Sequence, residues 1–306
     1  MDEIWDCIVV GGGAAGLSAA LVLGRARRRT LVVDAGRPSN APAHGIGGLL
    51  GHDGRPPEAL YATGRAELAK YPTVEVLAGE VVAWQRDEAG FVLELADGTR
   101  RVGHAVLLAT GMDYRSPELP GIAERWGRSV FHCPFCHGWE VREQPLGVLD
   151  RGPNGVHRAV LLSGWSNDVT LFTDGPGGLT DEEAATLAQA GVHVDTHRVI
   201  GLRGPGHELE AIVFADGTER PLHALLVPVT LHQRSTLAAQ LGAAALPPGQ
   251  LAVDAVDVDA WMQTSVPGLG AAGDLSAGMP SVANAIAAGS NAAVAVVRHL
   301  MSEVAA

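Results

Sequence analysis

The sequence predicts an α/β protein built from two domains. The chain has 306 residues, and single hydrophobic cores stop growing at about 250 to 300 residues. Its hydrophobic content of 47%, with 18% charged residues, is typical of a globular protein. A short apolar run, a glycine-rich turn and a helical pattern follow one another near the N-terminus, and this rhythm returns at residues 145–175. We therefore expect parallel strands joined by helices, once in each domain.

Charge excludes one class of partner. The formal net charge of -12 argues against nucleic acid, because binding to a phosphate backbone depends on cations that displace counterions.

The uncharged stretch 7–24 matches a membrane span in length. Three consecutive glycines would weaken such a helix, and a strand, turn and helix of a soluble domain explain the same run. Residues Asp2, Glu3 and Asp6 give an acidic start, which is wrong for an export signal. We expect a cytoplasmic protein without a membrane partner.

The first glycine turn has the spacing of a dinucleotide site. The β-branched run at 3–10 leads into GGGAAG, which is followed by a helical pattern. Gly11, Gly13 and Gly16 match GxGxxG, in which the glycines serve a tight turn, close approach to a pyrophosphate and packing of helix on strand. The alternative is a glycine-rich turn that binds no ligand.

The next strand supplies the acid that such a site needs. The run TLVVDAG at 30–36 contains Asp34, at the distance from Gly16 where a carboxylate accepts a hydrogen bond from a ribose hydroxyl. A ligand-free turn would leave Asp34 unexplained, so the combination favours a bound dinucleotide. Cys7 lies inside the first strand, and we interpret it as a small buried hydrophobe.

Two further stretches narrow the nucleotide to a flavin. Thr110 and Gly111 follow an apolar strand in HAVLLATG, and Gly273 and Asp274 close the stretch TSVPGLGAAGD. This pairing resembles the two-dinucleotide flavoprotein disulfide oxidoreductases. The resemblance implies that FAD is the cofactor, that Asp274 binds its ribityl chain, and that a helix at 281–297 directs its N-terminus at the flavin. The alternative role for Asp274 is the N-cap of that helix.

The stretch FHCPFCHGWE, residues 131–140, allows three interpretations. A c-type haem site normally goes with export, and the acidic start of this sequence argues against an export signal. A structural zinc site needs four ligands, but Cys133, Cys136 and the two flanking histidines crowd into six residues with no second cluster elsewhere, so no metal is expected. In a redox dithiol, Pro134 would be the first helical residue and Cys133 the cap, where unpaired N–H groups lower a thiol pKa.

The order of these motifs resembles low-molecular-weight bacterial thioredoxin reductase along nearly the whole chain. The resemblance implies two Rossmann-like domains: a discontinuous FAD domain at 1–114 and 231–306, and a smaller inserted domain at 115–230 that carries the CxxC pair. It also implies that Cys136 faces the flavin, that Cys133 exchanges with a thioredoxin-like protein or a small dithiol or disulfide, and that the chain forms a homodimer.

One departure from the reductase pattern follows the second cysteine. The reductases usually have an aspartate there, and this chain has His137. A histidine, with an ordinary pKa of about 6.5, is suited to removing a thiol proton at neutral pH. In this respect the motif resembles the flavin-dependent dithiol oxidases, which pass electrons from dithiols to oxygen. The alternative is that His137 caps a short helix.

A second departure lies where the family binds NADPH. The glycine pattern there becomes Asp150, Gly152 and Gly155, so a carboxylate stands where a pyrophosphate would approach. The basic cluster for the 2'-phosphate is replaced by Thr173, Asp174 and Gly175, and no arginine remains to pair that phosphate. The sequence thus predicts a degenerate NADPH site and argues against ordinary NADPH use. If a pyridine nucleotide binds at all, Asp174 points to an unphosphorylated ribose.

Several side chains keep two interpretations each. His44 and His52, in the loop 40–60, either line the flavin or are surface histidines. Phe135 and Trp139 either offer a hydrophobic shelf to a substrate or pack in the core. For the whole chain we expect a FAD-dependent thiol/disulfide oxidoreductase, with a dithiol oxidase as one alternative and a non-catalytic flavin redox sensor as another.

Overall fold

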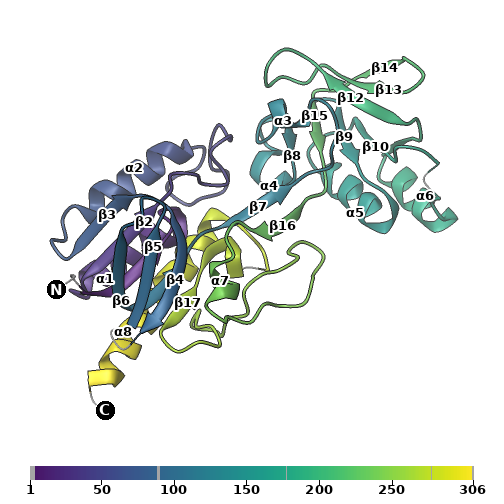
Figure 1. Ribbon diagram of the computed structural model, residues 1–306. Helices are drawn as coiled ribbons and strands as arrows, with labels where there is room; N and C mark the ends of the chain where they lie inside the picture. Colours follow the sequence, from purple (N-terminus) through teal and green to yellow (C-terminus); the bar gives the residue numbers. More distant parts are fainter. Residues whose placement is uncertain (1–3, 88–89, 177, 277, 305–306) are drawn as a thin grey trace. The chain divides into compact units, whose positions relative to one another are not determined.

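The computed structural model describes residues 4–87, 90–176, 178–276 and 278–304 (Figure 1). Contacts divide these residues into two compact units. Unit 1 comprises the described parts of Met1–Ala41, Pro57–Tyr114 and Thr230–Ala306, and unit 2 comprises those of Pro42–Pro56 and Arg115–Val229. The segment Pro42–Pro56, expected in the first domain, therefore groups with the second. Asp2 and Glu3, which entered the argument on export, lie outside the described residues.

Unit 1 is built on a mixed sheet. In the described part of the chain its strands follow the order β3-β2-β1-β6-β5-β4, and β17 pairs with β6 beside β5. The strands β3, β2, β1, β6 and β17 are parallel, whereas β4 and β5 are antiparallel additions. The strands of this sheet are β1 (Ile4–Val10), β2 (Thr30–Asp34), β3 (Val74–Ala78), β4 (Val81–Asp87), β5 (Gly90–Leu95), β6 (Arg100–Leu108) and β17 (Leu269–Ala271).

The helices of unit 1 include the two that the sequence predicted most clearly. The helix after the glycine turn, α1, contributes Ala19 and Leu23 to a buried cluster that also contains Ala292 and Val296 of α8. Small alanines on both helices allow this close packing. The helical elements are α1 (Ala14–Arg25), α2 (Pro57–Leu68), α7 (Leu237–Gln240), the 3-10 helix η1 (Gly273–Ser276) and α8 (Val282–Val304).

A two-stranded pairing marks where the chain passes from one unit to the other. β7 (Met112–Arg115) carries the chain out of unit 1, and β16 (Thr230–Gln233), which pairs with it, brings the chain back. These two strands contain the domain boundaries expected at 114/115 and 230/231. The two connections between the units therefore include short strands rather than only irregular loops.

Unit 2 repeats the α/β plan with a smaller sheet. Its described strands form a parallel sheet in the order β11-β10-β9-β15-β8, and β12, β13 and β14 form an antiparallel sheet. The strands are β8 (Val130–Phe131), β9 (Leu146–Leu149), β10 (Val169–Phe172), β11 (His193–Asp195), β12 (Val199–Arg203), β13 (Ala211–Phe214), β14 (Glu219–Pro221) and β15 (Ala224–Leu226). The helices are α3 (Ile122–Arg125), α4 (Pro134–His137), α5 (Gly152–Leu162) and α6 (Asp181–Gln189).

The predicted α/β class with two Rossmann-type domains is confirmed. The run expected as the first strand forms β1, and the rhythm at 145–175 forms β9, α5 and β10. Cys7 is fully buried in β1, and burial raises the pKa of its thiol to about 12, as fits a small buried hydrophobe. In the described part of the chain, no helix is long and apolar enough to cross a membrane.

The core of unit 2 supplies a stability test. Leu171 of β10 is fully buried, so replacing it by alanine should lower the free energy of unfolding by about 3 kcal/mol through lost burial and a residual cavity. Val194 of β11 is 40% exposed, and Val194→Ala should change it by less than about 1 kcal/mol. Urea unfolding followed by circular dichroism measures both changes. Equal effects would contradict this assignment of the core.

Candidate active site

The turn after β1 contains the three glycines with dinucleotide spacing. The N–H of Gly11 donates to the carbonyl of Val33 at 2.8 Å, which ties the turn to the end of β2. A Cβ at Gly16 would lie 1.8 Å from the carbonyl oxygen of Gly11, so only glycine fits there. Among the described residues, no heavy atom beyond the chain neighbours lies within 4 Å of a Cβ built on Gly13, the N-cap of α1. The start of the helix is therefore open.

The carboxylate of Asp34 lies against this turn. Its Oδ1 accepts hydrogen bonds from the N–H groups of Gly12, at 3.2 Å, and Gly36, at 2.9 Å. Arg65 of α2 places its Nη1 3.8 Å from Oδ2. The Asp34 side chain keeps 18% of its surface exposed. Backbone donors thus fix the carboxylate while one side remains open to the hydroxyl of a ligand.

The ends of β6 and β17 lie beside β1 and carry the remaining predicted cofactor residues. The N–H of Ala109 donates to Val10 at 2.8 Å, and the N–H of Ala272 donates to Leu108 at 2.9 Å. Thr110 and Gly111 directly follow the first of these contacts, and Gly273 and Asp274 directly follow the second. Because parallel strands end at one edge, the sheet of unit 1 brings all predicted cofactor residues to its carboxyl edge.

Asp274 has a partner that sequence analysis missed. The hydroxyl of Tyr114 donates to Asp274 Oδ2 at 2.9 Å. Burial raises the pKa of Asp274, while this hydrogen bond and the charge of Arg234 oppose the rise. The first turn of α8 is served instead by Ser281, whose Oγ accepts from the N–H of Asn284 at 3.1 Å. The alternative of Asp274 as the N-cap of this helix is therefore wrong.

In unit 2, Cys133 and Cys136 are joined as a disulfide, with their Cα atoms 5.3 Å apart. Pro134 is the first residue of α4 and Cys133 is its N-cap, as the sequence predicted. The helix has only four residues and ends at His137, so its dipole is small. The disulfide uses both sulfur atoms that a zinc or haem site would need.

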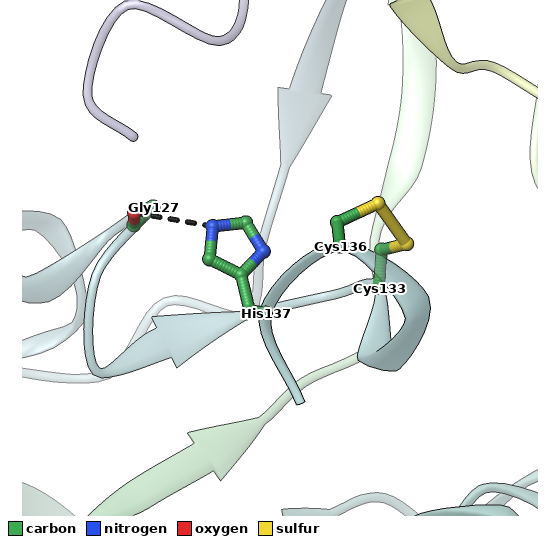
Figure 2. The surroundings of a disulfide bond; sticks show 4 residues. All are labelled: Gly127, Cys133, Cys136 and His137. Carbon is green, nitrogen blue, oxygen red and sulfur yellow. Dashed lines mark hydrogen bonds between the residues drawn. A yellow bond between two sulfur atoms is a disulfide. The ribbon is translucent and has the colours of Figure 1, made fainter. Parts of the chain in front are cut away.

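The ring of His137 is held on one side by Gly127 (Figure 2) and on another by Phe131. Its Nε2 lies 3.2 Å from the carbonyl oxygen of Gly127, and its plane stacks on Phe131 with centroids 5.5 Å apart. A carbonyl only accepts, so Nε2 carries the proton and Nδ1 has the lone pair. Nδ1 is buried, has no hydrogen-bond partner in the described part of the chain, and lies on the disulfide side of the ring in Figure 2.

Burial also decides the charge of His137. Burial lowers the pKa of the ring, and the repulsion from His44 adds to this; the carbonyls of Gly127 and Cys133 and the carboxylate of Glu140 act in the opposite direction. The net shift is downward, so the ring is neutral at pH 7. A neutral ring whose Nδ1 carries no proton can accept one. The hydrogen bond of Nε2 goes to Gly127, which is not part of α4, so this nitrogen does not cap the helix.

The aromatic residues around the disulfide differ in exposure. Phe135 is 70% exposed and Trp139 is 66% exposed, so their alternative role as core residues is wrong. Arg142 lies 3.9 Å from the ring centroid of Trp139, and Phe135 meets Trp165 edge-on. Both rings are accessible, one between the two cysteines in the sequence and the other three residues after Cys136.

The three other histidines considered above are engaged locally. His132 stacks on Trp126, and burial lowers its pKa to about 4. His44 places Nδ1 against Arg128, and His52 places Nδ1 3.1 Å from Arg55. The rings of His132, His44 and His52 therefore each contact a side chain of unit 2.

The carboxyl edge of the unit 2 sheet begins with Asp150, which follows β9. Its Oδ2 forms an ion pair with Arg158 of α5, and its Oδ1 accepts from the N–H of Arg151 at 2.8 Å. Asp174, after β10, accepts from Arg151 Nη2 and from the N–H of Val199, both at 2.8 Å. The prediction that no arginine remains near Asp174 is wrong, because Arg151 reaches it from the turn after β9, but this guanidinium is paired with the Asp174 carboxylate.

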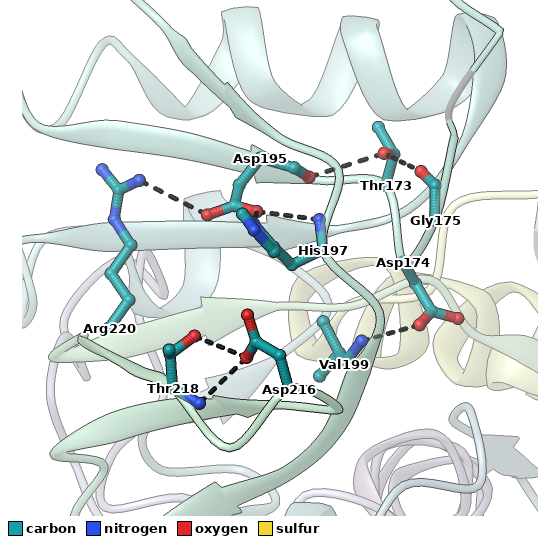
Figure 3. A network of polar contacts seen from close by, with 9 residues as sticks. All are labelled: Thr173, Asp174, Gly175, Asp195, His197, Val199, Asp216, Thr218 and Arg220. Atoms are coloured by element: carbon teal, nitrogen blue, oxygen red, sulfur yellow. Dashed lines mark hydrogen bonds and ion pairs between the residues drawn. The ribbon is translucent and has the colours of Figure 1, made fainter.

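Figure 3 shows that this pattern continues to β11. Asp195, the last residue of β11, bonds to His197 Nδ1 at 2.7 Å and lies 3.7 Å from Arg220. Thr173 is buried, and its hydroxyl donates to the carbonyl of Gly175 at 2.6 Å. Asp174 turns toward Val199 in the same view. Three successive strand ends in unit 2 therefore carry acids that the protein itself neutralises.

Comparison with known proteins decides the family. The model of the pyridine nucleotide-disulphide oxidoreductases matches residues 5–289. The chain belongs to this family. A thioredoxin reductase (tcpT) of Claviceps purpurea is 34% identical, over 94% of this chain and 91% of its own length. A thioredoxin reductase (aclD) of Aspergillus oryzae is 31% identical, over 97% of this chain and 96% of its own.

A solved structure shares the fold along nearly the whole chain. An oxidoreductase from Agrobacterium tumefaciens is 35% identical, with a TM-score of 0.91 over 98% of this chain and 99% of that one. The protein is thus a thioredoxin reductase-like, FAD-dependent disulfide oxidoreductase, and the predicted resemblance is confirmed. The hypothesis of a non-catalytic flavin sensor loses its support, because these relatives are oxidoreductases by name.

The residues at the carboxyl edge of unit 1 fit the FAD of this family. The open helix start at Gly13 offers unpaired N–H groups to a pyrophosphate, and Asp34 offers a carboxylate to a ribose. Asp274 would meet the ribityl chain, with Tyr114 orienting its carboxylate. Sequence reasoning missed Tyr114 and Arg65, because their partners are remote in the chain and neither belongs to a motif.

The close approach at Gly16 predicts how FAD binding can be removed. Gly16→Ala would force Cβ against the carbonyl of Gly11 and displace the turn, so the purified variant should lose most of its flavin absorbance relative to protein absorbance. Gly164→Ala is the matched control, because its Cβ would lie 3.4 Å from the nearest heavy atom. A yellow Gly16→Ala variant with full occupancy would contradict the assigned site.

Proposed function

We propose that this enzyme works in the direction of dithiol oxidation, without a pyridine nucleotide as electron donor. Asp150 is the observation that carries this proposal. Its carboxylate occupies the position of the first glycine of a nucleotide turn, and its own Arg158 and the backbone of Arg151 satisfy it. A pyrophosphate would meet a negative charge there, and the nearby cation is already paired.

The cysteine pair supplies the substrate chemistry. A substrate thiolate attacks the sulfur of Cys133, the bond to Cys136 breaks, and Cys136 leaves as a thiolate. The second substrate thiolate attacks the mixed disulfide and releases the substrate as a disulfide. Two electrons pass to the cysteine pair, and two thiol protons must be removed. FAD held at the carboxyl edge of unit 1 would supply the acceptor for this electron pair and would pass it on to an oxidant such as molecular oxygen.

His137 is the base in this proposal. Its Nε2 donates to Gly127, so Nδ1 is the nitrogen that can take a proton from a thiol at the disulfide. The low pKa keeps the ring neutral and ready to accept at pH 7. The assignment of Cys136 as the sulfur that faces the flavin rests on the family resemblance.

The substrate is a thioredoxin-like protein or a small dithiol. The names of the thioredoxin reductases among the relatives support the first, and the exposed rings of Phe135 and Trp139 beside the disulfide suit either. A reductase that draws electrons from NADPH is the second candidate, because unit 2 retains the strand, helix and strand of a nucleotide-binding half.

Anaerobic flavin reduction tests the direction. A small dithiol should bleach the flavin absorbance of the purified protein, and admission of air should restore it. NADPH and NADH should leave the absorbance unchanged on the same timescale, because Asp150 and Asp174 replace the phosphate-binding residues. Rapid bleaching by NADPH would overturn the proposal and support the reductase instead.

Replacement of His137 tests the base. His137→Asn should retain the flavin and slow its reduction by a dithiol about a hundredfold, the usual contribution of a general base.

In the wild type, the rate of flavin reduction by a dithiol should fall only as the pH drops below about 6.5, since burial lowers the pKa of His137 and the neutral form accepts the proton. Stopped-flow absorbance measures both. His197→Asn, at an exposed histidine, is the control, and an equal loss there would contradict the assignment.

A further inference from the structure

The segment Pro42–Pro56, which we name the strap, belongs to unit 2 by its contacts although the chain on both sides of it belongs to unit 1. An antiparallel bridge between Ile46 and Arg55 closes the strap on itself. Asp53 Oδ1 accepts from the N–H of Gly48 at 2.8 Å inside it. The strap is therefore an ordered part of unit 2.

One end of the strap meets the turn that contains Gly127. A Cβ at Gly127 would lie 2.9 Å from Cβ of Pro42, so the two segments approach as closely as a glycine permits. The neighbouring Arg128 donates through Nε to the carbonyl of Pro42 and through Nη1 to Nδ1 of His44. A guanidinium only donates, so His44 must accept with an unprotonated Nδ1.

The middle of the strap meets the helix that carries the disulfide. A Cβ at Gly47 would lie 2.7 Å from the carbonyl oxygen of Cys136. The strap thus contacts both segments that surround His137: the turn that supplies its carbonyl partner and the helix that supplies its sulfur neighbour.

The Gly127 carbonyl decides which nitrogen of His137 can accept a proton. Gly127 has φ +73°, a left-handed conformation that depends on the packing of its turn. If the turn shifts and the carbonyl moves away, Nε2 loses its acceptor at 3.2 Å and the proton can reside on Nδ1. In that tautomer, the nitrogen on the disulfide side is a donor and cannot act as a base.

We propose that Arg128 and His44 are positioning residues for His137: by fastening the strap to the turn at Gly127, they keep the Gly127 carbonyl on Nε2 and leave Nδ1 free. The proposal rests on the proposed function only in assigning a thiol proton to Nδ1. The charged and titratable groups around this contact are Arg128 and His207 beside His44, and Glu140 and His132 beside His137.

Nitrogen NMR of the holoenzyme labelled with 15N-histidine tests the tautomer directly. The His137 signals are identified by their loss in His137→Asn. At pH 7.5 the wild type should show Nε2 protonated and Nδ1 unprotonated, and Arg128→Gln should show a mixture of tautomers. Arg203→Gln, at an exposed arginine of β12 that pairs with Glu210 and Glu219, should keep the wild-type spectrum. An unchanged His137 tautomer in Arg128→Gln would overturn the proposal.

His44 offers a matched pair of variants. His44→Asn places an amide oxygen near the position of Nδ1 and can still accept from Arg128, whereas His44→Ala cannot. His44→Ala should mix the tautomers and slow flavin reduction by a dithiol roughly tenfold to a hundredfold, since a misplacement of about 1 Å can cost that much. His44→Asn should restore both properties. Equal behaviour of the two variants would overturn the proposal.

The outcomes separate this proposal from the proposed function. If dithiols fail to reduce the wild-type flavin, the proposed function fails, and the NMR comparison still decides the role of Arg128 and His44. Because His44 is exposed, its variants provide the test even if Arg128→Gln does not fold. Arg128→Lys should rescue only in part, because one ammonium cannot reproduce the two directed bonds of a guanidinium.

Discussion

Parallel pairing of a central strand with neighbours on both sides is the constraint on which both units depend. β1 pairs with β2 and β6, and β9 pairs with β10 and β15, so the parallel strands of each sheet end at one edge. Peptide N–H groups and side chains from remote parts of the chain meet there. In unit 1 this edge carries Asp34, held by backbone donors at an open helix start. In unit 2 the same geometry carries Asp150, Asp174 and Asp195. Side chains, not topology, therefore distinguish the two edges.

The ion pair between Arg151 and Asp174 at the edge of unit 2 contributes little to stability. Arg151 and Asp174 are 63% and 36% exposed, and exposed pairs of this kind contribute about 0 to 1 kcal/mol to folding. In the proposed function, they act instead on an incoming phosphate, which would have to compete with a carboxylate for each arginine. A small folding contribution and a large change in ligand preference are compatible, because the same charges face solvent in the free protein and an anion in a complex.

The sequence predicts those parts of the protein whose signal is local. Gly16, Asp34 and Pro134 each occupy a position that neighbouring residues define, and each takes its expected place. The position of His137 after Cys136 is also local, but the ring nitrogen that carries the proton depends on the carbonyl of Gly127, and a backbone carbonyl leaves no mark in the sequence. The hydrogen bond between Tyr114 and Asp274 spans 160 residues, and the grouping of the strap with unit 2 depends on contacts between segments far apart in the chain. Contacts between segments so far apart in the chain cannot be predicted from local sequence patterns.

The burial of Cys7 has a consequence for redox selectivity. A thiolate, rather than a thiol, attacks a disulfide, and burial raises the pKa of Cys7 to about 12, so its sulfur stays protonated at pH 7. Its sulfur is also shielded by the strands on either side of β1. The third cysteine therefore stays out of thiol exchange, and the folded chain offers oxidants, alkylating reagents and substrates a single redox couple. Scrambled pairings that would trap a substrate on the wrong sulfur are prevented by packing alone.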